Sequence, residues 1–125
     1  MARPDAVRRV KSYSAANGYV YQYYFYEVNR TSHKGTPAGE FVYAVSVDRQ
    51  SAFPVRILVH KSALDAWGKA NGRPLTSSEE YAVAKMRLFH AFDEGAVPHT
   101  AEAAGQVDLL VDESNLETML EQLNI

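Results

Sequence analysis

The spacing of the apolar residues changes at Ser62, and this change constrains the fold more than any other feature of the sequence. Before Ser62 the apolar residues recur at every second position, which is the period of a half-buried β-strand. After Ser62 they recur three and four positions apart, which is the period of an amphipathic helix. A sheet followed by helices predicts the α+β class.

Antiparallel strands in simple meander order are expected in the first half of the chain. Three or four are predicted, over about residues 8–15, 19–30, 40–48 and 54–60. Asn17-Gly18 lies between the first two and supplies the positive φ angles of a type I′ hairpin turn. A short N-terminal helix closed by Gly18 is the alternative. Residues 31–39 are polar and rich in glycine and proline, which predicts a loop.

Helices are expected in the second half. They are predicted over about residues 62–71, 77–94 and 113–123, packed on one face of the sheet. Ser62 is a candidate cap for the first helix, and Thr76 with Glu79 forms a capping box for the second. Residues 107–111 are a candidate for a short last strand. The first two helices are expected to cover one face of the sheet. That face carries the side chains of Tyr43, Val45, Ile57 and Val59.

The composition fits one ordinary domain. The chain has 125 residues, of which 46% are hydrophobic, and residues 1–7 are a candidate for a flexible arm. The absence of cysteine excludes disulfides and thiolate sites. We expect a cytoplasmic protein with no membrane partner, because no apolar segment is long enough to span a bilayer and no secretory signal is recognisable.

The charge is divided unevenly between the two halves. Residues 1–61 carry nine Lys and Arg against four Asp and Glu, whereas residues 62–125 carry four against eleven. The net charge of −2 predicts weak nucleic-acid binding or none, because such binding depends on neutralising phosphates. The four histidines lack metal-site spacing, and the glycines form no phosphate-binding loop. We therefore expect no metal and no cofactor.

Six residues are candidates for a binding site. They are Tyr21, Tyr23, Phe25, Arg56, His60 and Lys85. One interpretation places the three aromatic residues on the outer face of the sheet with Ala44 and Ser46, beside the two basic residues of the last strand. The result would be a shallow trough that stacks bases or sugars. The other interpretation covers the aromatic residues with the C-terminal segment or with a second copy of the chain.

Lys85 falls near the middle of the apolar stripe of the second predicted helix. Burial would lower its pKa and make it a candidate base or Schiff-base nucleophile. In the other interpretation its stem crosses apolar surface, and its ammonium pairs with a carboxylate such as Asp48 or lies on an aromatic ring. We expect the second arrangement.

The leading functional hypothesis is a non-catalytic binding or interaction module that uses the aromatic sheet face. We expect a homodimer, with a protein partner as a further candidate, because the strand from Tyr19 to Val28 has more apolar surface than one core face can use. The alternative is a small enzyme with a pocket between sheet and helices around Lys85, His60 and Asp48.

Overall fold

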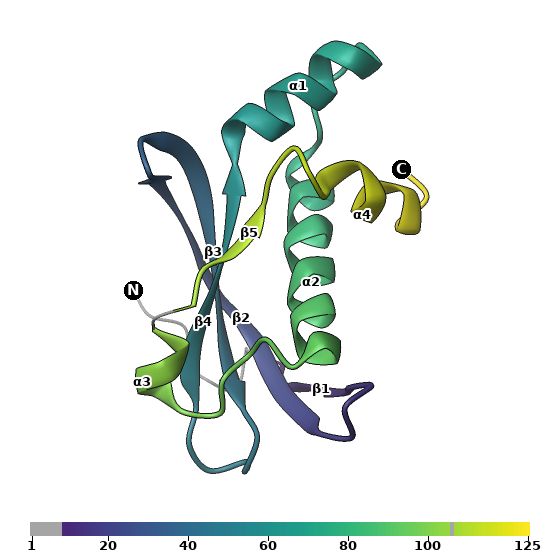
Figure 1. The fold of residues 1–125 in the computed structure, drawn as a ribbon. Helices are drawn as coiled ribbons and strands as arrows, with labels where there is room; N and C mark the ends of the chain where they lie inside the picture. Colours follow the sequence, from purple (N-terminus) through teal and green to yellow (C-terminus); the bar gives the residue numbers. More distant parts are fainter. Residues whose placement is uncertain (1–8, 106) are drawn as a thin grey trace.

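The computed structural model describes residues 9–105 and 107–125 and confirms the α+β class, with a sheet followed by helices (Figure 1). Its elements in chain order are β1 (Lys11–Ser14), β2 (Val20–His33), β3 (Thr36–Ser46), β4 (Phe53–His60), α1 (Lys61–Asn71), α2 (Ser77–Glu94), α3 (Ala101–Ala104), β5 (Leu109–Val111) and α4 (Leu116–Gln122). Residue 8 and the expected arm 1–7 lie outside the described residues.

The sheet has five strands in the order β1-β2-β3-β4-β5. The first four pair antiparallel, but β5 pairs parallel with β4, so the expectation of a purely antiparallel sheet of three or four strands is wrong. The physical reason is the connection: β4 and β5 are joined through α1, α2 and α3, and such a helical crossover returns the chain in its original direction.

A long hairpin arm, residues 27–40, replaces most of the expected loop over residues 31–39. There β2 and β3 stay paired as far as His33 and Thr36. The two residues between them, Lys34 and Gly35, have φ angles of 49° and 81°, as a type I′ turn requires. The prediction was wrong because most side chains of β2 in the arm are exposed, so its strands need no apolar alternation.

The first hairpin is confirmed, but its turn is of a different type. Five residues, Ala15 to Tyr19, connect β1 to β2. The N–H of Gly18 donates to the carbonyl of Ala15 at 3.0 Å, and Gly18 alone in this turn has a positive φ, of 91°. This is a type I turn closed by a left-handed glycine. Within residues 9–18 there is no helix, so the alternative of an N-terminal helix closed by Gly18 fails there.

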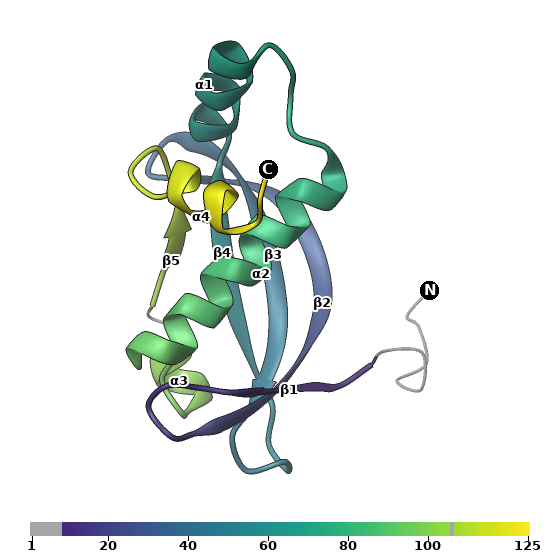
Figure 2. The same ribbon diagram turned by 90° about the vertical axis from the view of Figure 1, so that its right-hand side faces the viewer.

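Helix α2 fills the inner face of the sheet (Figure 2). Tyr21 stacks on Phe92 with ring centroids 4.1 Å apart, and Tyr13 stacks on Phe89 at 4.3 Å. Helix α4 packs against α2 and buries three further side chains, Leu116, Met119 and Leu120. By contrast, α1 lies beyond the end of β4 and buries only Ala63 among its residues, so it does not cover the expected face (Figure 1).

The helix ends follow the sequence closely. The capping box of Thr76 and Glu79 is present, and both Gly72 and Gly95 end their helices with a φ of 70°. Ser62 is not the cap of α1, because that helix begins at Lys61 and its N-cap residue, His60, makes no side-chain capping bond. None of the helices in the described ranges has the combination of length and apolar sequence that crossing a membrane needs.

The hydroxyl of Tyr43 is a defect in this core. The residue is fully buried and its hydroxyl makes no hydrogen bond of ordinary geometry, although the hydroxyl of Tyr81 lies near it; burial, and then Tyr81, raise the pKa of Tyr43. We expect Tyr43→Phe to leave the free energy of unfolding unchanged or to raise it by up to about 1 kcal/mol, because an unsatisfied buried hydroxyl is removed. Denaturant unfolding measures this, and a loss of stability would contradict the assignment of an unpaired hydroxyl.

Candidate functional site

Two of the three aromatic candidates lie in the core, and the third, Phe25, is partly buried beside it. Tyr21 is fully buried, Tyr23 is 5% exposed, and both face α2. Tyr23 pairs with Val45 across the sheet, whereas it is Tyr24 that pairs with Ala44. Since cross-strand partners share a face, Tyr21 and Tyr23 do not lie on the Ala44 face, and the expected trough cannot be built from them. Helix α2, and not the C-terminal segment or a second copy, covers the aromatic residues.

Arg56 and His60 belong to a polar network on the outer face. Nδ1 of His33 lies 3.2 Å from Nε2 of His60. The other ring nitrogen of His33, Nε2, lies 3.3 Å from a carboxylate oxygen of Asp108. Arg56 lies 3.4 Å from Glu40. These contacts join β2, β3, β4 and the residue before β5, so they fasten the hairpin arm to the far edge of the sheet. Sequence reasoning missed the pairing of His33 and Asp108. No group of three or more potential ligands for a metal occurs in the part of the chain that the structure describes.

Asp48, His60 and Lys85, the residues of the alternative enzyme site, contact different parts of the structure. The carboxylate of Asp48 accepts bonds from the backbone N–H groups of Gln50 and Ser51, both at 2.8 Å, and these bonds lower the pKa of Asp48. Through these bonds the carboxylate of Asp48 stabilises the turn that follows β3. Since His60 belongs to the outer network and Lys85 lies beside Tyr23 on the inner face, the three do not meet in one pocket.

Lys85 lies on aromatic rings. Its ammonium is 5.9 Å from the ring centroid of Tyr23 and 5.8 Å from that of Phe89. Burial lowers the pKa of Lys85, and contact with Lys11 lowers it further. No ion pair to Asp48 is formed. The geometry agrees with a stem that crosses apolar surface and a head that rests on aromatic rings.

A groove of about 590 Å³ lies between the hairpin arm, the start of α1 and the α1–α2 connection. Its apolar lining consists of Val28, Pro37, Ala38, Phe41, Val59, Leu64, Pro74 and Leu75. Among the charged residues at the groove, Lys61 pairs with Asp65 at 2.8 Å, and burial raises the pKa of Glu80. The volume is in the range of about 300–1,000 Å³ that small-molecule sites occupy.

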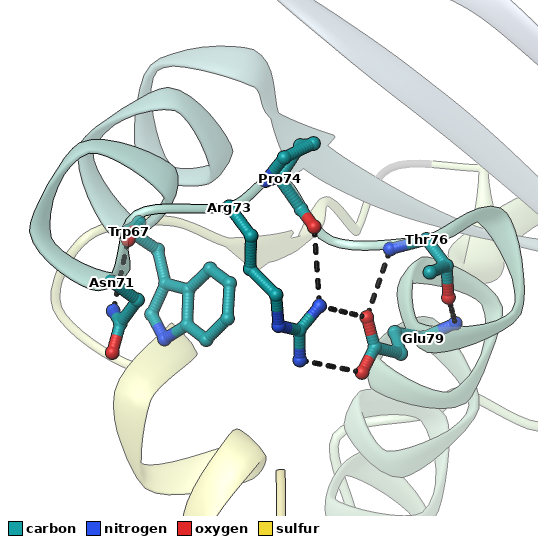
Figure 3. A network of polar contacts seen from close by, with 6 residues as sticks. All are labelled: Trp67, Asn71, Arg73, Pro74, Thr76 and Glu79. Atoms are coloured by element: carbon teal, nitrogen blue, oxygen red, sulfur yellow. Dashed lines mark hydrogen bonds and ion pairs between the residues drawn. The ribbon is translucent and has the colours of Figure 1, made fainter.

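One wall of the groove is fixed by the network in Figure 3. The guanidinium of Arg73 donates two bonds to the carboxylate of Glu79, at 2.8 and 3.0 Å, and lies 5.1 Å from the ring centroid of Trp67. Glu79 also accepts a bond from the backbone N–H of Thr76 at 2.9 Å. These contacts hold Pro74 and the next residue in place, so the groove has a preformed wall.

The margin of the sheet beside this groove is an open strand edge. Strand β1 pairs with only the first four residues of β2, Val20 to Tyr23. Among the described residues, no strand pairs with the far part of β2, residues 27–33, on that side (Figure 2). Val28, on this segment, is 53% exposed. An open edge carries backbone donors and acceptors that can pair with another strand.

Comparison of the chain with protein-family models, with curated proteins and with solved structures found no match.

The contribution of the Arg73–Glu79 pair to stability should depend on pH. The guanidinium lowers the pKa of Glu79 to about 2 from its ordinary 4.5. A lowered pKa means that the stabilisation is present above about pH 4.5 and is lost as the pH falls towards 2. We expect the carboxyl carbon of Glu79, followed by NMR, to titrate near 2 in the parent and higher in Arg73→Gln. A parent midpoint near the ordinary value would contradict the bidentate pair.

The position of Lys85 on aromatic rings can be tested by replacing it with methionine. We expect Lys85→Met to keep the packing of the stem and discard a partly desolvated charge, so stability should stay level or rise by up to about 1 kcal/mol. Denaturant unfolding beside the parent measures the difference. A loss on the order of 3 kcal/mol would show instead that the ammonium anchors a buried partner.

Proposed function

We propose that the chain is a non-catalytic interaction module that acts as a homodimer, with the two copies joined through the open edge of β2. The observation that carries the proposal is the run of seven residues, Glu27 to His33, that no described strand pairs on one side. Pairing would satisfy backbone N–H and C=O groups that otherwise depend on water.

Most of the exposed apolar residues follow β1 and β2, and one of them, Val28, lies in the open segment of β2. Six large apolar side chains are exposed among the described residues: Val10, Tyr19, Val20, Tyr26, Val28 and Ile125. All but Ile125 lie on β2 or within a residue of β1 or β2. Monomers rarely gather such residues in one region, whereas interfaces do.

A second copy is the partner that fits this edge best. Each copy presents the same strand, and a two-fold axis between Arg30 and Thr31 would place the two strands antiparallel, with Val28 of one copy opposite His33 of the other, which is the ordinary geometry of an isologous contact. The pairing would extend the sheet from five strands to ten across the dimer.

The edge also carries features that restrict its pairing. A bulge interrupts the register between Phe25 and Glu27, and the charged Glu27 and Arg30 follow it. Bulges and charges are common protections against unspecific edge pairing. We therefore expect a specific contact over residues 28–33, beyond the bulge, and not open-ended aggregation.

The dimer can be tested with two lysine substitutions in one strand. Val28 and Val20 are 53% and 42% exposed, but Val20 already pairs with Ser14 of β1. In analytical ultracentrifugation at micromolar concentration we expect twice the chain mass of 13.9 kDa for the parent and for Val20→Lys, but a monomer for Val28→Lys. The added charge would be placed in the paired region only in Val28→Lys.

Two results would contradict the proposal. One is a parent chain that stays monomeric at about 100 μM, a concentration at which a complex with a micromolar Kd is mostly formed. The other is equal weakening of the dimer by both lysine variants, because the contact would then not be centred on the edge beyond Tyr23.

A further inference from the structure

A small hollow, separate from the groove, lies where β1 begins and the open edge of β2 starts. Its volume is about 200 Å³, and it is lined by Arg9, Lys11, Tyr23, Tyr24, Phe25 and Tyr81. Lys85 stands beside it, one helical turn after Tyr81, and contacts both Lys11 and the ring of Tyr23. Three cationic side chains and several aromatic rings therefore meet at one place.

No carboxylate of residues 9–105 or 107–125 forms an ion pair with the positive charges at this hollow, which are those of Arg9, Lys11 and Lys85. Lys85 is instead in contact with a like charge, and two ammonium groups side by side repel each other. An anion placed between them would replace this repulsion with two charge-assisted hydrogen bonds.

We propose that this hollow is a binding site for a small aromatic carboxylate, held by Lys11, Lys85 and Arg9 through its carboxylate and by the surrounding rings through its own ring. The hollow is smaller than the pockets of about 300–1,000 Å³ that take drug-sized ligands, so the ligand is correspondingly small. The partly buried rings of Phe25 and Tyr81 offer faces and edges for aromatic contact. Inorganic phosphate fits less well, because it is strongly hydrated and gains nothing from aromatic walls. The proposal does not depend on the oligomeric state.

Benzoate is the probe, and benzamide is its neutral counterpart of the same shape. We expect benzoate to shift the NMR signals of Tyr23 and Tyr81 saturably and to raise the thermal midpoint. Benzamide should bind at least about tenfold more weakly, because a charged hydrogen bond contributes about 1.5–3 kcal/mol. Lys85→Met should weaken benzoate binding by about tenfold or more.

A matched control uses a lysine elsewhere on the surface. Lys69 is exposed on α1, so Lys69→Met removes the same charge far from the hollow and should leave benzoate binding unchanged. If both variants bind benzoate equally well, or if the parent does not bind it at millimolar concentration, there is no site here. Tight binding of inorganic phosphate without binding of benzoate would overturn the assignment to an aromatic carboxylate.

Discussion

The stacking of α2 on the aromatic residues of β1 and β2 is the contact on which the rest of the structure depends. Tyr13 stacks on Phe89, and Tyr21 stacks on Phe92. Each such pair contributes about 0.5–1.5 kcal/mol beyond the burial of its surface. Because α2 occupies the aromatic face, the rings of Tyr21 and Tyr23 are not open to a ligand. The surfaces left for partners are the open edge of β2, the groove beside it and the hollow near Lys85.

Local signals in the sequence predicted much of the fold. The capping box and Gly95 predicted α2 over residues 77–94, and the structure has it over Ser77–Glu94, because a capping box is formed within four residues. The hairpin arm was missed because an exposed arm needs no apolar alternation. The pairing of β5 was missed for another reason: its neighbour in the sheet is set by a crossover of helices and not by its own residues.

The candidate sites could be predicted less well than the fold. They depend on which strands pair and on which face of the sheet each side chain lies. Period-two alternation placed Tyr21 and Tyr23 on one face of β2, but only the pairing of Tyr23 with Val45 decides that this is the inner face. His33 and Asp108 are far apart in the chain and meet because the sheet brings their strands together. The environment of Lys85 was partly predictable, since the helical period placed it on the apolar stripe of α2.

One experiment can test together the burial of the aromatic face and the proposed binding of a second copy at the open edge of β2. NMR with a soluble paramagnetic agent, at low and at high protein concentration, tests both parts together. We expect the rings of Tyr21 and Tyr23 to stay unaffected throughout, whereas the methyl groups of Val28 should be broadened in dilute solution and protected at high concentration. Strong broadening of the Tyr21 ring, or exposure of Val28 that does not change with concentration, would contradict it.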